Sequence, residues 1–161
     1  MANLPPLSFE FYPPQTQEGV NKLKHTTKEL NKYKPDFFSV TFGAGGSTKE
    51  RTLDAVFELS NSDFNVAPHI SCISSSKVEI KELLDQYKSQ KINHLVALRG
   101  DNPSGAINSG EFNYANELVR FIKLEMGDAF KIDVAAYPEV HPESESAKQD
   151  FINFKNKVEA G

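Results

Sequence analysis

Short apolar segments alternate with longer segments of helical periodicity along the whole chain. The short segments have the length and residue types of β-strands, and they span residues 8–12, 37–42, 66–72, 94–100 and 131–137. The segments of helical periodicity span about 17–33, 47–61, 77–90, 113–125 and 146–158. Five consecutive β-then-α units predict an α/β fold with a parallel sheet and right-handed crossovers.

Such a sheet is either a complete doubly wound open sheet or the N-terminal five βα units of a (β/α)8 TIM barrel, which usually needs ~250 residues. Strands of an open sheet with helices on both sides are apolar on both faces. Each strand predicted here has one apolar face and one small or polar face. The small or polar faces consist of Ser8, Glu10 and Tyr12; Ser39 and Thr41; Ala67, His69 and Ser71; Ala97, Arg99 and Asp101 (opposite Val96 and Leu98); and Asp133, Ala135 and Tyr137. The pattern favours the barrel, with these faces lining its interior.

Polar side chains also become more frequent toward the carboxyl ends of the predicted strands. They are Glu10, Thr41, His69, Arg99 with Asp101, and Tyr137. An open sheet concentrates its site at one switch point, whereas a barrel draws site residues from many strands at its carboxyl face. We therefore expect residues 1–161 to form a single catalytic barrel domain that is truncated, with strands six to eight missing. The end of the chain, 158–161, has the pattern of a helix closed by a glycine, the usual prelude to a further strand.

Charge and composition exclude several classes of protein. The chain has 18 basic and 22 acidic residues and no basic stripe, which argues against a nucleic-acid partner. No apolar run approaches the ~20 residues that span a bilayer, so no membrane association is expected. Cys72 is the single cysteine, which rules out an internal disulfide and fits a cytoplasmic location. His69, His94 and His141 lack a metal-binding spacing, and we predict no metal.

Glu10 is the candidate for proton transfer. It lies on the predicted inner face between Phe9 and Phe11. Burial there would disfavour the carboxylate and raise its pKa, which is the property of a general acid. The alternative is a structural glutamate paired with a buried Lys or Arg.

Arg99-Gly100-Asp101 ends the fourth predicted strand. The glycine would let the backbone approach a ligand closely, and Asp101 near Glu10 would raise a carboxyl pKa further. The alternative is an ordinary β-to-α turn in which Asp101 caps a neighbouring group.

Two further segments are candidates for binding phosphate or nucleotide. The loop 43–47 is rich in glycine and precedes a helix, although a tight turn explains it equally well. In the last helix, Asp150, Asn153 and Lys157 share one face, separate from a core stripe of Ala147, Phe151, Phe154 and Val158. With His141 upstream, that polar face could hold an adenosine or a pyrophosphate. Alone, it would be an ordinary solvated surface.

Several of these segments together resemble the methylenetetrahydrofolate reductase family, the flavin enzymes of one-carbon metabolism. The matching stretches are Ser8-Phe9-Glu10-Phe11-Tyr12-Pro13-Pro14, Ser39-Val40-Thr41-Phe42-Gly43-Ala44, Ala67-Pro68-His69, His94-Leu95-Val96-Ala97-Leu98-Arg99-Gly100-Asp101, and Ala135-Ala136-Tyr137-Pro138-Glu139-Val140-His141-Pro142-Glu143. They occur in the family's order along the whole chain, and their combination is highly specific.

The resemblance implies a barrel that binds FAD at its carboxyl face. NADH or NADPH reduces the flavin and leaves, and 5,10-methylenetetrahydrofolate then takes its place and is reduced to 5-methyltetrahydrofolate. Glu10 matches the general acid that protonates the leaving nitrogen, and Asp101 matches a carboxylate beside the flavin and the folate. The positions that match FAD or nucleotide contacts are Thr41, Phe42, Ala44, His69, Arg99, Gly100, Asp101, Tyr114, Ala115, Ala135, Tyr137, His141, Asp150, Asn153, Asn156 and Lys157.

The chain departs from the family's pattern at two points. Asn156 stands where bacterial relatives often carry Arg, and the region that supplies further folate and nicotinamide contacts is absent. A non-catalytic flavin- or folate-binding fragment, or a subunit that needs a partner chain, is therefore the alternative function. An open-sheet mononucleotide-binding module is a third reading. We expect the complete protein to be a homo-oligomer.

Overall fold

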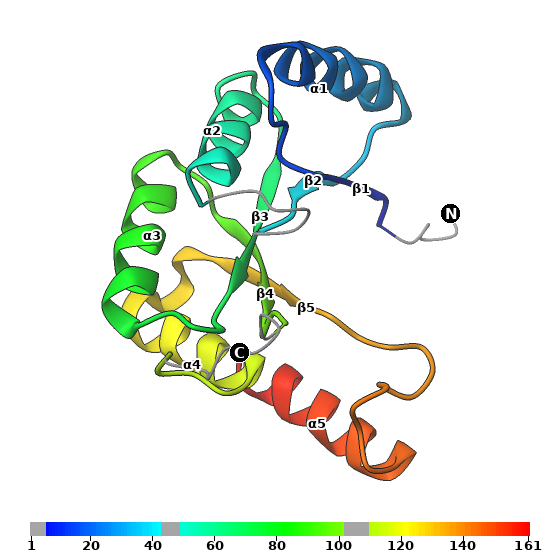
Figure 1. The fold of residues 1–161 in the computed structure, drawn as a ribbon, viewed down its shortest axis with the longest axis vertical. Helices are drawn as coiled ribbons and strands as arrows, with labels where there is room; N and C mark the ends of the chain where they lie inside the picture. Colours follow the sequence, from blue (N-terminus) through cyan, green and yellow to red (C-terminus); the bar gives the residue numbers. More distant parts are fainter. Residues whose placement is uncertain (1–5, 43–48, 102–109) are drawn as a thin grey trace.

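The computed structural model describes residues 6–42, 49–101 and 110–161 (Figure 1). Ala44 and the rest of the glycine-rich loop, 43–47, lie outside the described residues. The strands are β1 (Ser8–Phe11), β2 (Phe37–Val40), β3 (Val66–Ser71), β4 (His94–Leu98) and β5 (Lys131–Val134). The helices are α1 (Gln17–Leu30), α2 (Lys49–Ser60), α3 (Lys77–Ser89), α4 (Ala115–Met126) and α5 (Ala147–Glu159), with short 3-10 turns at Asn31–Tyr33 and Gly127–Ala129.

The strands pair in chain order, β1-β2-β3-β4-β5, and every neighbouring pair is parallel. A doubly wound open sheet needs a point where the strand order reverses, and no such point exists among these strands. Sequential parallel order is the arrangement of a (β/α)8 barrel. The predicted fold class is therefore confirmed, and the open-sheet alternative is wrong.

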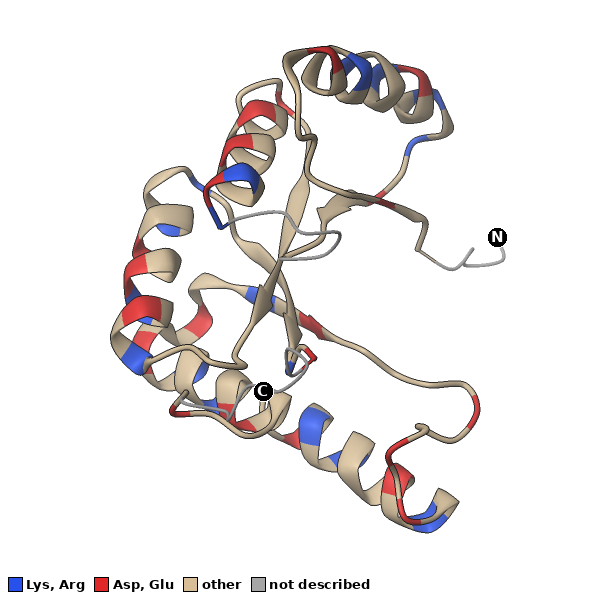
Figure 2. Ribbon diagram, viewed as in Figure 1, with Lys and Arg blue, Asp and Glu red and all other residues tan. Residues whose placement is uncertain are grey.

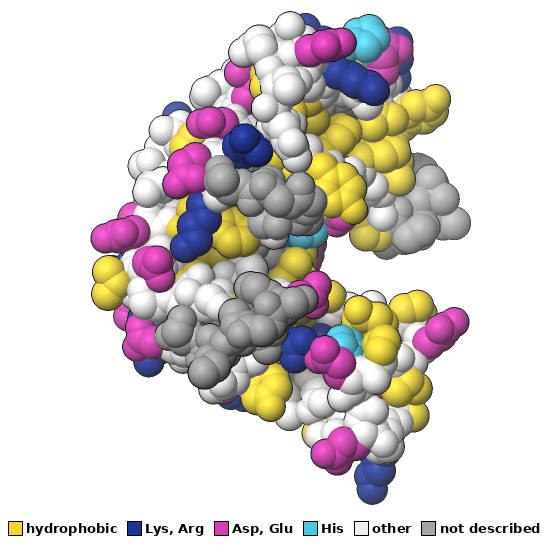
Figure 3. Space-filling view, in the orientation of Figure 1, with side chains coloured by type: hydrophobic (Ala, Val, Ile, Leu, Met, Phe, Trp, Pro, Cys, Tyr) yellow, Lys and Arg dark blue, Asp and Glu magenta, His cyan; other side chains and the backbone are white. Residues whose placement is uncertain are grey.

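The helices cover one side of the sheet and leave the other side uncovered (Figure 1). Val40, Ile70 and Leu95 on the strands are buried in one core with residues of the helices, such as Leu84 and Ile122. The opposite side is hollow in the space-filling view (Figure 3). Charged side chains lie mainly on the helices, with both signs interspersed (Figure 2).

The register of the strands tests which residues face inward. Paired residues of a parallel sheet project to the same side, and Glu10 is aligned with Ser39, as predicted. His69 is aligned with Val96, and the outward-facing Ile70 is aligned with Ala97. The inner face of β4 therefore carries His94, Val96 and Leu98, whereas the sequence pattern assigned Ala97, Arg99 and Asp101 to it.

The error on β4 has two physical causes. The small Ala97 packs into the helix-facing core, whereas branched apolar side chains such as Val96 are common inside barrels. A prediction that places small and polar residues inside and apolar residues outside therefore reverses the two faces of β4. The strand also ends at Leu98, so alternation does not apply to Arg99 and Asp101. The inward direction of His94 is independently evident. Its Nε2 lies 2.7 Å from Asp133 Oδ2 on β5, and its ring meets Phe37 edge-on.

The predicted core stripe of α5 is not buried. Phe151 is 68% exposed and Val158 is 57% exposed, and α5 contains no buried residue. The helix packs along α4, below the sheet in Figure 1. Helical periodicity identified an apolar face correctly but could not show that nothing in the described residues covers it.

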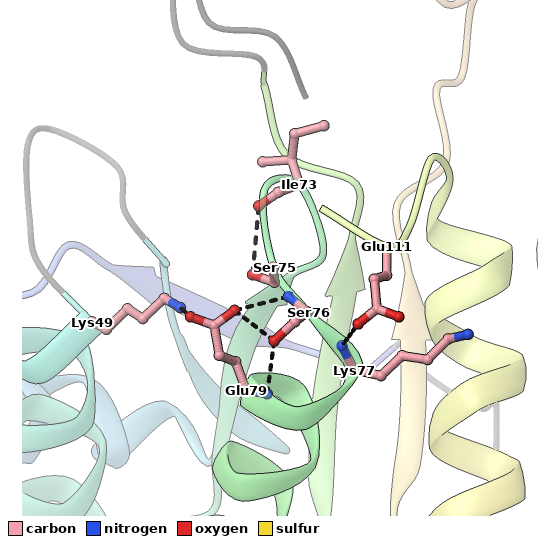
Figure 4. Close-up of polar contacts among 7 residues, drawn as sticks. All are labelled: Lys49, Ile73, Ser75, Ser76, Lys77, Glu79 and Glu111. Atoms are coloured by element: carbon pink, nitrogen blue, oxygen red, sulfur yellow. Dashed lines mark hydrogen bonds and ion pairs between the residues drawn. The ribbon is translucent and has the colours of Figure 1, made fainter. Parts of the chain in front are cut away.

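The start of α3 is fixed by reciprocal capping bonds. The Glu79 backbone N–H donates to Ser76 Oγ at 3.2 Å, and the Ser76 backbone N–H donates to Glu79 Oε2 at 2.8 Å. Lys49 Nζ, at the start of α2, lies 3.6 Å from Glu79 Oε1. The Lys77 backbone N–H donates a hydrogen bond to Glu111 Oε2 (Figure 4). The bonds from Ser76 lower the pKa of Glu79, with Lys49 contributing less. These contacts join α2, α3 and the segment before α4 near the carboxyl ends of the strands.

We expect Ser76→Ala to lower the free energy of unfolding by about 1 kcal/mol, because it removes the acceptor for an orphan helix N–H. Urea unfolding followed by circular dichroism measures the loss. The matched variant is Ser146→Ala, which removes the same kind of cap from α5. Since α5 buries no residue, that variant should shift the unfolding midpoint less, and equal shifts would contradict the expectation.

Tyr87 on α3 is fully buried, and its hydroxyl has no hydrogen-bond partner among the described residues. Burial also raises its pKa. Because a buried unpaired hydroxyl is unfavourable, Tyr87→Phe should leave the unfolding free energy unchanged or increase it by about 1 kcal/mol. Tyr87→Leu should lower it, because it removes the edge-on contact with Phe57. Chemical denaturation compares the two, and a clear loss of stability in Tyr87→Phe would show that the hydroxyl is bonded.

Candidate functional site

A cavity of about 640 Å³ opens at the carboxyl ends of β4 and β5. The beginning of α4 and one face of α5 form its other walls. Its volume is typical of a small-molecule site. The sequence-predicted residues that line it are Arg99, Gly100, Asp101, Tyr114, Ala115, Ala135, Tyr137, His141, Asp150, Asn153, Asn156 and Lys157.

The lining also includes residues that sequence reasoning did not select. They are Ala97, Leu98, Asn116, Glu143 and Ser144. Glu143 belongs to the quoted Ala135-to-Glu143 stretch, so its position in that motif could have identified it. Asn116 carried no sequence signal, because it follows two selected residues without a pattern of its own.

The turn after β4 depends on Gly100. Its φ is +84°, a conformation that favours glycine. A Cβ built at this position would lie 2.1 Å from Ser71 Oγ, and Ser71 Oγ donates to the Arg99 carbonyl at 2.9 Å. The close approach that requires glycine is therefore to Ser71 at the end of β3. This contact holds Arg99 and Asp101 at the rim of the cavity.

Arg99 is already engaged within the cavity. Its Nη2 lies 2.7 Å from Glu143 Oε2, and its Nε donates to the Gly100 carbonyl at 3.1 Å. The guanidinium is partly exposed and supplies one of the two fixed positive charges in the lining. Lys157 supplies the other.

The α5 wall presents the predicted polar face. Lys157 Nζ donates to the Ala135 carbonyl at 2.6 Å, and burial lowers the pKa of Lys157 while Asp150 opposes that shift. Asp150 Oδ2 accepts the His141 backbone N–H at 3.1 Å. Two residues of this face, Asp150 and Lys157, thus tie α5 to the segment after β5, whereas Asn153 is exposed.

His141 organises the loop between β5 and α5. Its ring meets Tyr137 edge-on at 4.4 Å between centroids. Its Nδ1 accepts the Glu143 backbone N–H at 3.1 Å, and its carbonyl accepts the Ser144 backbone N–H at 2.9 Å. The loop is thus folded back so that Tyr137, His141 and Glu143 all reach the cavity.

Glu10 and His69 form a second group on the inner face of the sheet. Glu10 Oε2 lies 3.2 Å from His69 Nε2. Burial lowers the pKa of His69, and the charge of Glu10 opposes that shift. The Glu10 side chain is 54% exposed, so the expected burial is not observed. Its partner is a histidine rather than a Lys, an Arg or Asp101.

Thr41 has an unused hydrogen-bonding group. It is buried just beyond β2, and its Oγ1 has no hydrogen-bond partner among the described residues. The Thr41 carbonyl accepts a hydrogen bond from Thr52 Oγ1 at 3.2 Å, and the Thr41 backbone N–H donates to the Phe11 carbonyl at 3.0 Å. Phe42 packs partly buried against the core. A buried hydroxyl of this kind is satisfied by water or by a ligand.

The described residues show few other candidate sites. No three His, Cys, Asp or Glu residues gather there in a way that could hold a metal ion. Within the same residues, no helix has the length and hydropathy to cross a bilayer. Burial raises the pKa of the Cys72 thiol to about 11, which keeps it protonated at neutral pH and unsuited to act as a nucleophile.

The chain was then compared with known proteins. A family model described as methylenetetrahydrofolate reductase matches residues 3–161. The 5,10-methylenetetrahydrofolate reductases of Pectobacterium carotovorum and Escherichia coli K12 are 42% and 43% identical to it over 157 residues, covering 96% of this chain and 51% of theirs. The Arabidopsis thaliana protein named methylenetetrahydrofolate reductase (NADH) 1 is 37% identical over 168 residues, which is 28% of its length.

The chain spans about half the length of the bacterial relatives it matches. Similarity nevertheless runs through nearly all of the chain, and it includes both the inner-face group and the cavity lining. With the family match over residues 3–161, this confirms the resemblance inferred from the motifs: the chain belongs to the methylenetetrahydrofolate reductase family.

Proposed function

We propose that this chain supplies the FAD site and the proton donor of a reductase that converts 5,10-methylenetetrahydrofolate to 5-methyltetrahydrofolate. In this proposal residues 1–161 are an incomplete catalytic barrel domain. The observation that carries it is the cavity at β4 and β5, because its lining includes 12 of the 16 positions that the family resemblance assigns to FAD or nucleotide. When bound, FAD would accept a hydride from NADH or NADPH and deliver one to the folate.

The residues at the cavity suit a dinucleotide. Arg99 and Lys157 are cations that can pair with a diphosphate, and Tyr114 and Tyr137 offer aromatic surfaces at the mouth. Thr41 has a buried hydroxyl free to bond a ligand. The full proposed set is Thr41, Phe42, Ala44, His69, Arg99, Gly100, Asp101, Tyr114, Ala115, Ala135, Tyr137, His141, Asp150, Asn153, Asn156 and Lys157.

Glu10 is the proposed general acid. The five-membered ring of the folate must open before hydride arrives, and opening requires a proton on the departing nitrogen. Glu10 on β1 shares the inner face with Ser39, and its side chain is 54% exposed, so a substrate can reach it. Asp101, at the rim of the cavity, is proposed to lie beside both flavin and folate.

Other parts of the proposal concern the complete protein. The choice between NADH and NADPH is open, although one plant relative is named for NADH. A homo-oligomer and a cytoplasmic location stay predictions, the second resting on a single cysteine.

A second function is favoured by one specific observation. The inner face of the sheet is hollow in Figure 3, and Glu10 on that face is 54% exposed. The chain could therefore bind flavin or folate without turnover, or act as a subunit with a partner chain. Flavin binding without folate reduction by this chain, and restoration of reduction when a polypeptide carrying the missing strands is added, would favour this alternative.

Glu10→Gln should bind FAD and accept reducing equivalents from NADH normally, but reduction of methylenetetrahydrofolate should fall by about 10²- to 10⁴-fold, because only the second half-reaction uses the acid. Anaerobic stopped-flow absorbance of the flavin separates the two half-reactions. The control is Glu18→Gln, which removes an equal charge from the first turn of α1. Normal folate turnover in Glu10→Gln would show that the acid is another group.

Thr41→Val should weaken FAD binding about fivefold, the equivalent of one lost neutral hydrogen bond. Its unfolding free energy without ligand should be unchanged or higher, because the hydroxyl has no partner among the described residues. Thr52→Val is the contrast, since its hydroxyl bonds the Thr41 carbonyl and its loss should reduce stability. Flavin fluorescence titration and urea unfolding measure the two effects. A loss of stability without a loss of affinity in Thr41→Val would remove Thr41 from the site.

A further inference from the structure

The most informative contact in the cavity is the ion pair between Arg99 and Glu143. Arg99 Nη2 and Glu143 Oε2 are 2.7 Å apart, within the range of a charge-assisted hydrogen bond. The two residues are 44 positions apart in the chain. Arg99 follows β4, whereas Glu143 comes from the loop before α5, so the contact bridges the cavity from one wall to another.

The loop is folded in a way that delivers Glu143 to Arg99. The Glu143 backbone N–H donates to His141 Nδ1, and the His141 backbone N–H donates to Asp150 on α5. The Ser144 backbone N–H closes the turn on the His141 carbonyl at 2.9 Å. The turn therefore places the Glu143 backbone where its side chain reaches Arg99.

The charges that line the cavity do not suit an anion in this state. Arg99 and Lys157 are positive, whereas Asp101, Glu143 and Asp150 are negative. Arg99 is paired with Glu143, and Lys157 is bonded to the Ala135 carbonyl. A diphosphate entering the cavity would find both cations already bonded. The Glu143 carboxylate would occupy the place beside the Arg99 guanidinium that a phosphate group needs.

The contact is also weak enough to be displaced. The Glu143 side chain is 62% exposed and that of Arg99 is 32% exposed. Ion pairs of such exposure contribute little to stability. Phosphate oxygens can bind a guanidinium through two parallel hydrogen bonds, a geometry that favours them over a single carboxylate oxygen.

From these observations we propose that Glu143 is an internal competitor for the anionic group of the nucleotide. Its carboxylate occupies Arg99 in the empty cavity and is displaced when a diphosphate binds there. The inference rests on the proposed function, because it takes the ligand to be a dinucleotide such as FAD. Glu143 thereby lowers the affinity of the cavity for phosphate-containing ligands and leaves its affinity for uncharged ones unchanged.

A small anion and a dinucleotide differ in the contacts that they gain in this cavity. A small anion gains only the contact with Arg99 and must still displace Glu143. A dinucleotide gains the same contact together with the rest of the cavity, including Lys157 and the α5 face. Displacing Glu143 costs both ligands the same free energy, so the dinucleotide, which makes the further contacts, still binds while the small anion is left with weak binding.

Glu143→Gln tests the proposal, because it removes the charge and keeps the size of the side chain. The matched control is Glu145→Gln, which removes the same charge from an exposed position in the same loop. Flavin-free protein of each kind is titrated with FAD, ADP and riboflavin, by fluorescence or calorimetry. Circular dichroism and thermal unfolding verify that all three proteins are folded alike.

We expect Glu143→Gln to bind FAD and ADP about three- to fivefold more tightly than wild type, the size of one exposed ion pair. Riboflavin, which has no phosphate, should bind all three proteins equally. Glu145→Gln should match wild type for every ligand. Unchanged or weaker FAD binding in Glu143→Gln would overturn the proposal, and so would an equal gain in Glu145→Gln, which would indicate a general effect of net charge.

Failure of the proposed function has a different signature. In that case none of the folded proteins binds FAD, and the contact is tested with inorganic pyrophosphate instead. Pyrophosphate binding that is tighter in Glu143→Gln than in wild type and Glu145→Gln would support the competition alone. No difference among the three proteins would overturn it together with the FAD site.

Discussion

The parallel pairing of β1 to β5 in chain order is the constraint on which the site depends. It brings the carboxyl ends of all five strands to one edge, so that Glu10, Thr41, His69 and Arg99 lie toward the same edge although they come from four different βα units. Side chains from the helix-facing side hold this arrangement. Val40, Ile70, Leu95 and Ala97 are buried there, which leaves the opposite side free for polar groups.

Sequence periodicity predicted the elements and their order because each strand had to bury one face against helices. It predicted the inner position of Glu10 and His69 for the same reason. It failed on β4, where Ala97 is small enough to pass for an interior residue although it packs under the helices. It also failed on α5, whose apolar stripe is exposed. Whether a face of a helix or strand is buried depends on the element that packs against it, and the sequence of one segment does not show which element that is.

Which residues meet in the site was only partly predictable. Motif positions brought together most of the cavity lining, including Asp150, Asn153 and Lys157, because helical spacing sets their common face. The partners of these groups were not predictable. Arg99 pairs with Glu143 across 44 positions, and Glu10 pairs with His69 rather than with Asp101. Such pairings follow from the loop fold at His141 and from the register of β1 to β3, and neither is encoded locally.

The two groups of functional residues differ in how much of their environment this chain supplies. The cavity is walled by β4, β5, α4 and α5, and its cations are positioned by contacts within the described residues. The Glu10 side chain is 54% exposed, and its proposed role as proton donor for ring opening would need the surrounding water removed. In the proposed function, flavin binding would therefore depend largely on these five βα units, whereas folate reduction would also need water removed from the inner face. Cofactor affinity and folate reduction should accordingly respond to substitutions at different residues of this chain.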